Sequence, residues 1–272
     1  ITEQVQKMVR QLVNDGKSPK TIKNILTVLN SALEQAVKAQ TIQRNPAKYA
    51  KLPSVRVKDI HPLSPAEIVS FVAAAQNSTY YAPLMCCLFL GLREGEALGL
   101  AWEHIDFENS KAIICQQLQK DKSKNGKFYI QQGTKNGQSR ILDVPDFLLE
   151  ILQDERQHQM RAHLAAGPAW QNTWGLCFTD AIGQCINPHT LWANFKRIAA
   201  SIGLPDARVH DLRHTSATLA LINGDDVKTV QANLGHATAA FTLQRYVHAS
   251  EEMKRASANR MQQFFIDNVK KA

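Results

Sequence analysis

The sequence predicts an α+β fold, in which a small helical module precedes a larger, mostly helical module that contains a small antiparallel sheet. Three observations support this prediction. Apolar residues recur at helical spacing along most of the chain. Short segments between residues 111 and 144 have the composition of strands instead. Residues 53–62 combine three charges with two prolines and have no apolar period, so we interpret them as a linker.

The first module, residues 1–52, is expected to be helical. A first helix is marked by an apolar stripe formed by Ile1, Val5, Met8, Val9 and Leu12. A second helix is expected to start with Ser18 as its N-cap and Pro19 at its first position. The residues expected to face the core from this helix are Ile22, Ile25, Leu26, Leu29, Leu33 and Val37. The pair Asn45-Pro46 ends the region.

The second module, residues 63–249, begins with a predicted capping box, in which Ser64 and Glu67 exchange hydrogen bonds across the first turn of a helix. That helix is expected to run to about residue 77. An apolar helix over residues 81–91 follows it. With 44% hydrophobic residues, the chain has ample material for a core.

The predicted sheet follows these helices. Strands are expected at 111–119, 128–132, 140–144 and 176–179. The dipeptide Asn136-Gly137 predicts a two-residue hairpin that joins the second of these strands to the third. From residue 145 onward the pattern is mostly helical, and residues 250–272 form a separate amphipathic helix.

The net charge of +8 is distributed unevenly. Residues 1–60 contain 11 Lys or Arg and 4 Asp or Glu, which gives +7, whereas the remaining residues contain 21 and 20, which gives +1. A basic first fifth on a nearly neutral body suggests a module that binds nucleic acid. A solubilising surface is the alternative that charge alone leaves open.

Other features limit the class of protein. The longest apolar run, residues 80–92, is too short to span a bilayer and contains a proline. The first residues show no signal-peptide pattern. Five cysteines without metal-ligand spacing fit free thiols in a reducing cytoplasm rather than a disulfide framework.

Two segments carry paired charges. Arg93 directly follows an apolar helix, where burial would require an anionic partner, and Glu96 can face it across one helical turn. Taken alone, this pair is better explained as a structural ion pair. Further on, His210 and Arg213 lie at i and i+3 on one helix face, a combination suited to binding a phosphate while protons move.

The alternatives for the histidine segment are a surface helix end and a zinc site. His210 and His214 at i and i+4 resemble the H-E-x-x-H zinc pattern, but Asp211 stands where that pattern has glutamate. The shorter side chain reduces the reach of a general base. We therefore expect no metal.

Three more residues complete the set. Gly235 is expected to end a helix and present His236, and Tyr246 follows ten residues later. Lys135 precedes the predicted hairpin turn. Singly, each has a plain structural explanation: a satisfied polar histidine, a half-buried tyrosine and a solvated lysine.

Together, two arginines, two histidines, a lysine and a tyrosine can transfer a phosphoryl group without metal. Guanidinium groups offset the charge of the pentavalent phosphate. A tyrosine hydroxyl, with a pKa of about 10 in water, needs a base to become a nucleophile. A lysine can protonate the leaving oxygen. The tyrosyl ester conserves the energy of the broken bond, so resealing requires no ATP.

The order Arg…Lys…His-x-x-Arg…Leu-Gly-His…Tyr resembles the tyrosine recombinase, or phage integrase, family. The matching motifs lie at 91–98, 134–140, 210–215 and 234–246. Residues 1–50 look like the family's helical core-binding domain, so the resemblance covers the whole chain. The sequences of the first two motifs are most similar to those of integrases from conjugative transposons and related mobile elements. Many of those carry an N-terminal arm-binding domain, which we expect to be absent here because the chain opens on Ile1.

The resemblance implies a role for each motif residue. Arg93 and Arg213 would clamp the scissile phosphate, and Lys135 would be the general acid for the 5′-hydroxyl. Glu96 resembles the acidic residue that orients the arginine and the histidine. His210 would act as base or acid, and His236 would hydrogen-bond a non-bridging oxygen. Tyr246 would form a 3′-phosphotyrosyl intermediate. No cofactor is implied.

The resemblance also implies partners. Both modules would close on double-stranded DNA at recombination sites, and the expected phosphate contacts are Lys17, Lys20, Lys23, Lys122 and Lys124. The helix 250–272 would dock on a neighbouring subunit in a tetramer, or else pack on its own domain. An accessory excision factor and a bacterial, cytoplasmic, nucleoid-associated location are further implications. A topoisomerase-like relaxing enzyme and a non-catalytic DNA-binding protein on the same fold remain the alternatives.

Overall fold

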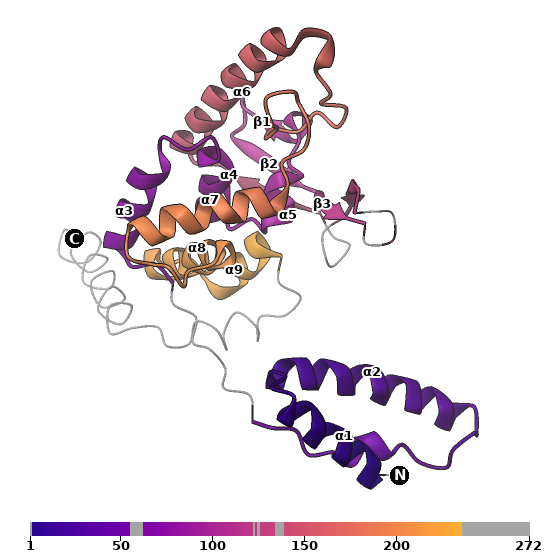
Figure 1. The fold of residues 1–272 in the computed structure, drawn as a ribbon. Coiled ribbons are helices and arrows are strands. Elements are labelled where there is room, and N and C mark those ends of the chain that lie inside the picture. Colours follow the sequence, from indigo (N-terminus) through magenta and orange to yellow (C-terminus); the bar gives the residue numbers. More distant parts are fainter. Residues whose placement is uncertain (1, 55–61, 122, 124–125, 134–138, 236–272) are drawn as a thin grey trace, which may run out of the picture. The chain divides into compact units, whose positions relative to one another are not determined.

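The computed structural model describes residues 2–54, 62–121, 123, 126–133 and 139–235 (Figure 1). The chain divides into two compact units, Ile1–Asp59 and Ile60–Ala272. Each unit has its own hydrophobic core. Within the described residues, no helix is both long enough and apolar enough to cross a membrane.

The first unit consists of two helices and a short 3₁₀ turn, at Thr2–Asn14 (α1), Pro19–Lys38 (α2) and Pro46–Tyr49 (η1). The predicted start of α2 is confirmed, because the Ser18 side chain accepts a hydrogen bond from the Thr21 amide at 3.1 Å and Pro19 occupies the first turn. The buried core of this unit is Val5, Val9, Ile22, Leu26 and Ala47.

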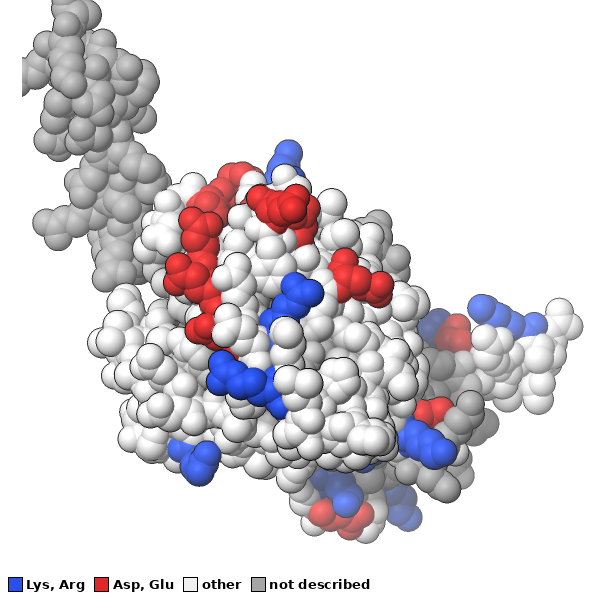
Figure 2. Space-filling model, turned by 90° about the horizontal axis from the view of Figure 1, so that it is seen from above, with Lys and Arg blue, Asp and Glu red and all other residues white. Residues whose placement is uncertain are grey.

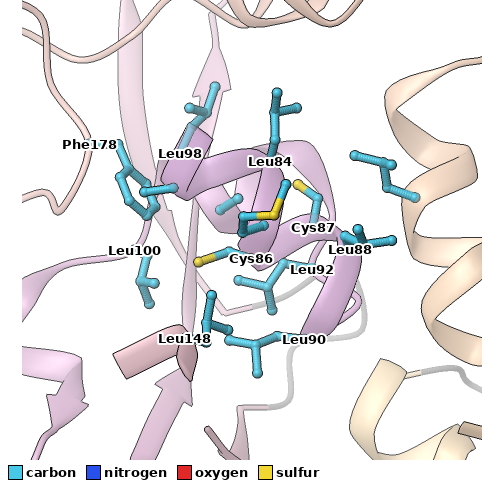
Figure 3. Packing of buried hydrophobic residues seen from close by; sticks show 14 of the residues in the cluster. Leu84, Cys86, Cys87, Leu88, Leu90, Leu92, Leu98, Leu100, Leu148 and Phe178 are labelled. Carbon is cyan, nitrogen blue, oxygen red and sulfur yellow. The ribbon is translucent and has the colours of Figure 1, made fainter. Parts of the chain in front are cut away.

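The second unit is built around one apolar helix. Its helices are Pro65–Ala75 (α3), Tyr81–Phe89 (α4), Glu94–Leu98 (α5), Asp146–Ala166 (α6), Pro188–Ser201 (α7), Val209–Asn223 (α8) and Val227–Leu234 (α9), with 3₁₀ turns at Trp102–His104 (η2) and Gly167–Ala169 (η3). Helix α4 packs against α5, α6 and α8, and Figure 3 shows its leucines and cysteines surrounded by leucines from neighbouring segments. The predicted capping box of α3, between Ser64 and Glu67, is confirmed.

The strands form two separate antiparallel sheets. Ile105–Asp106 (β1), Lys111–Ile114 (β2) and Arg140–Asp143 (β5) make one sheet in the order β1-β2-β5. Gln116–Lys120 (β3) and Phe128–Gln132 (β4) make the other. The predicted hairpin between the strands at 128–132 and 140–144 is therefore wrong, because β4 pairs with β3 and β5 pairs with β2.

The single strand expected at 111–119 is also wrong, since it breaks at Cys115 into β2 and β3. The break lets β3 leave the first sheet and pack against α5. Gly99 allows this approach, because a Cβ there would lie 2.6 Å from the Leu118 amide nitrogen. The Gln116 side chain then donates to the Gly99 carbonyl at 2.7 Å. Packing against α5 thus determines the pairing more strongly than the local turn signal does.

The expected strand at 176–179 is reduced to two isolated bridges. Leu176 pairs with Ala101, and Thr179 pairs with Cys185. Between these bridges the segment is held by a side chain, because Gln159 on α6 donates to the carbonyls of Leu176 and Cys177 at 2.9 and 3.1 Å. A buried glutamine therefore satisfies backbone groups that a strand partner would otherwise bond.

Candidate active site

The centre of the site is the carboxylate of Glu96 on α5. Arg93 lies at the N-cap of this helix, where its amide donates to Glu96 Oε2 at 3.0 Å and its Nη1 donates to Oε1 at 2.5 Å. The predicted pairing of these two residues across one turn is therefore present. The Glu96 side chain has no exposed surface, so its charge requires the partners that surround it.

Two further arginines reach the same carboxylate from distant elements. Arg140, the first residue of β5, donates from Nη2 to Oε2 at 2.7 Å and from Nη1 to Oε1 at 3.2 Å. Arg213 on α8 places its Nη1 3.8 Å from Oε2. We call Arg93, Glu96, Arg140 and Arg213 the Glu96 cluster. Helix α5, strand β5 and helix α8 thus bring together four residues that are far apart in the sequence.

The same three arginines also hold the C-terminal end of α9. Arg140 Nε donates to the Asn233 carbonyl at 2.7 Å, Arg213 Nη2 donates to the Leu234 carbonyl, and Arg93 Nη2 donates to the Gly235 carbonyl at 3.2 Å. Three consecutive carbonyls at the negative end of a helix therefore each accept from a different guanidinium.

Gly235 permits this arrangement. It caps α9 in the left-handed conformation, with φ +62°, as the sequence predicted. A Cβ at this position would lie 3.3 Å from Nη1 of Arg140, so the glycine leaves room for the guanidinium. The next residue in the chain is His236.

The Glu96 cluster has a surplus of positive charge. Within the part of the chain that is described, three arginines share one carboxylate, which leaves a formal charge of +2. Burial raises the pKa of Glu96, but hydrogen bonds and charge from Arg140 and Arg93 outweigh burial and lower it to about 2. The carboxylate is therefore ionised throughout the physiological range, and the remaining positive charge suits an oxyanion.

His210 lies beside this cluster at the start of α8. It is exposed, and its ring forms an edge contact with the buried ring of His214 at a centroid distance of 4.6 Å. Partial burial of the ring, together with the nearby Arg213 charge, lowers the pKa of His210. The neutral imidazole therefore predominates at neutral pH and can accept a proton.

Asp211 stabilises the start of α8. Its carboxylate accepts from the Arg208 amide at 2.9 Å and pairs with the Arg208 guanidinium at 2.5 Å, which caps the first turn of α8. This side chain is engaged at the helix start and does not resemble the free glutamate of the zinc pattern. In the described ranges, no group of three or more His, Cys, Asp or Glu side chains is arranged to hold a metal ion.

The structure thus brings four of the predicted residues together: Arg93, Glu96, His210 and Arg213. Lys135, His236 and Tyr246 lie outside the described residues, as do Lys122 and Lys124. The remaining candidates are in the first unit, where Lys17, Lys20 and Lys23 are exposed at and just before the start of α2.

Arg140 is the residue that sequence reasoning missed. A signal for it exists in the strand alternation, because Arg140 shares a strand face with Leu142, which is buried, whereas Ile141 and Asp143 are exposed. An arginine on the inward face of a strand needs a carboxylate or carbonyl partner. Its partner Glu96 is distant in sequence, so the pattern could flag Arg140 without identifying the contact.

Comparison with known proteins gives consistent results. A model of the phage integrase family matches residues 61–253. A tyrosine recombinase XerC-like protein of Caldanaerobacter subterraneus subsp. tengcongensis is 30% identical over 97% of this chain and 71% of its own length. The ICEBs1 integrase of Bacillus subtilis (strain 168) is 24% identical over 93% of this chain and 68% of its own length.

Solved structures share the fold. The Tn1549 transposon integrase in complex with a circular intermediate DNA aligns with a TM-score of 0.78 at 22% identity, covering 96% of this chain and 85% of that one. The lambda integrase bound to DNA aligns with a TM-score of 0.60 at 17% identity, covering 92% and 83%.

Proposed function

The chain belongs to the phage integrase family of tyrosine recombinases, and from this membership we propose that it is a site-specific recombinase that cleaves and rejoins DNA through Tyr246. Its biological role would be the integration and excision of a mobile element. The observation that carries the proposal is the Glu96 cluster, in which Arg93 and Arg213 from separate elements converge with a net positive charge next to His210.

The proposed chemistry is an exchange of phosphodiester bonds. The Tyr246 oxygen attacks the scissile phosphorus, a new P–O(Tyr) bond forms and the P–O5′ bond breaks. Arg93 and Arg213 stabilise the charge that develops on the non-bridging oxygens, to which His236 adds a hydrogen bond. His210 takes up the phenolic proton, and Lys135 protonates the departing 5′-oxygen. Reversal of these steps reseals the strand, so the exchange requires neither a metal ion nor ATP.

DNA contact is proposed to involve both units. Residues 1–52 would form the core-binding domain, 53–62 the linker and 63–249 the catalytic domain. The exposed lysines Lys17, Lys20 and Lys23 support phosphate contact by the first of these. In the second unit, Figure 2 shows acidic side chains gathered in a band on the face above α6, a helix with four acidic and two basic residues. DNA is therefore expected to approach a different face of that unit.

Assembly on DNA is proposed to use residues 250–272. A cavity of about 400 Å³ between α4, α8, α9 and β5 offers an acceptor of mixed character, in which Leu88, Leu142 and Val230 lie beside polar residues such as Asp143 and Asn233. An amphipathic helix from a neighbouring subunit would fill such a cavity and generate a tetramer. An accessory excision factor would set the direction of recombination.

The decisive test is a nicked suicide substrate that traps the covalent intermediate. The wild-type chain is expected to form a protein–DNA adduct in excess EDTA, and mapping of the DNA-linked peptide should identify Tyr246. Tyr246→Phe is expected to bind DNA normally and form no adduct, because the substitution removes only the nucleophilic oxygen. Adduct formation by this variant at the wild-type rate would exclude Tyr246. A synapsis assay with two sites distinguishes recombination from topoisomerase-like relaxation.

A further inference from the structure

Arg140 uses its guanidinium donors within the protein. Nη1 and Nη2 bond the two oxygens of Glu96, and Nε bonds the Asn233 carbonyl. Its side chain is 9% exposed, compared with 22% for Arg93 and 2% for Arg213. Unlike these two, it spans both oxygens of Glu96 with hydrogen bonds from its side chain. These contacts fix the groups around it.

We propose that Arg140 is a positioning residue for DNA cleavage, which locks Glu96 and the end of α9 together so that Arg93 and Arg213 face the phosphate in a fixed arrangement. The inference rests on the proposed recombinase function. It adds a residue on β5 to a site whose other described members lie on α5 and α8 or beside them.

Arg140 fixes the orientation of the Glu96 carboxylate. Arg93 bonds this carboxylate at 2.5 Å, whereas Arg213 is 3.8 Å away. Without Arg140, Oε2 would lose its shortest side-chain donor, and the carboxylate would be free to turn toward Arg213. Either arginine would then occupy a different position relative to a bound phosphate. Displacements of about 1 Å can reduce a catalysed rate on the order of 100-fold.

Arg140 also holds the C-terminal end of α9. Arg140 bonds the first of the three carbonyls at the end of this helix and lies against Gly235. Arg93 and Arg213 hold the other two carbonyls. Loss of Arg140 would therefore loosen the point at which the chain leaves α9 toward His236 and Tyr246. A single side chain thus links the arginine pair to the segment that precedes the nucleophile.

Arg140 also favours the ionised form of Glu96. Within the described residues, the charged and titratable groups that interact with Glu96 include Arg93, Arg140, Arg213 and Cys87. Burial favours the protonated form of Glu96, and the hydrogen bond and charge of Arg140 are the largest influences against it. Replacing Arg140 by a neutral residue should therefore raise the pKa of Glu96, so that the carboxylate becomes protonated at a higher pH.

The experiment compares Arg140→Gln and Arg140→Lys with wild type in the suicide-substrate assay across the acidic pH range. Arg140→Gln should bind DNA as well as wild type and cleave it roughly 10- to 100-fold more slowly at neutral pH. As the pH is lowered, the activity of Arg140→Gln should also begin to fall at a higher pH than the activity of wild type. Arg140→Lys keeps the charge and should retain the wild-type pH profile. It should recover only part of the rate, since an ammonium cannot reproduce the guanidinium geometry.

The control for general destabilisation is Gln159→Ala. Gln159 bonds the carbonyls of Leu176 and Cys177 in the same unit, and its loss weakens the fold at a different place. If Arg140→Gln cleaves no more slowly than Gln159→Ala, or if its pH profile matches wild type, the positioning role is wrong. If Arg140→Gln does not fold, a wild-type cleavage rate for Arg140→Lys would likewise show that the positioning role is wrong. A wild-type chain that forms no adduct would overturn the recombinase function itself, and the role of Arg140 with it.

Discussion

At the residue scale, Glu96 is held ionised in a place where burial alone would neutralise it. Its pKa is lowered to about 2 in the folded chain, from an ordinary value of 4.5. A group whose pKa is depressed by folding contributes stability above its unfolded pKa, and this contribution is lost as the pH falls toward the folded pKa. The stabilisation by Glu96 should therefore be complete above about pH 5 and disappear between that pH and 2.

Glu96→Gln tests this linkage. At pH 7 the substitution leaves three arginines without their shared carboxylate, and we expect the free energy of unfolding to decrease by about 3–5 kcal/mol. The difference from wild type should shrink as the pH is lowered from 5 to 3 in urea-unfolding experiments. Glu150→Gln on the exposed face of α6 is the matched control and should leave stability unchanged at each pH. A pH-independent difference for Glu96→Gln would mean that packing, not ionisation, is responsible.

At the scale of a single element, the end of α9 matters because its backbone is part of the site. Gly235→Ala introduces a side chain where φ is +62° and the nearest atom is a guanidinium nitrogen at 3.3 Å. Gly203→Ala has the same kind of backbone strain, with φ +82° and no atom within 4 Å. Both should lose about 1–2 kcal/mol of stability from the left-handed conformation. Only Gly235→Ala should also slow DNA cleavage; equal cleavage by the two variants would contradict a role for this helix end.

Elements also show where prediction from sequence succeeds. The start of α2 at Ser18, the capping box of α3 and the glycine cap of α9 were predictable, because each depends on residues within one turn. The pairing of Arg93 with Glu96 is equally local. Strand pairing was not predictable, since Asn136-Gly137 suggested a hairpin while the contact between β3 and α5 decided the outcome. Arg140 was missed for a related reason: its partners Glu96 and Asn233 are far away in sequence.

At the scale of the whole molecule, most of the net charge belongs to the first unit. If Lys17, Lys20 and Lys23 each neutralise a phosphate, their replacement by Gln should reduce the slope of log K against log salt by roughly 2.7, or about 0.9 per contact. Binding measured over a range of salt concentrations gives this slope directly. Lys48→Gln is the control, because Lys48 already pairs with Glu34 at 2.9 Å. An unchanged slope in the triple variant would show that other residues contact the backbone.

The hydrogen bonds from three arginines to the three carbonyls at the end of α9 also affect how the protein becomes active. The contacts join residues separated by 142, 93 and 21 positions. Closing such long loops costs entropy that only late, cooperative contacts repay. A chain still emerging from the ribosome, or one in which α9 has come loose, therefore lacks an assembled anion site. The proposed DNA cleavage would in this way stay inactive until the folding of the second unit is complete.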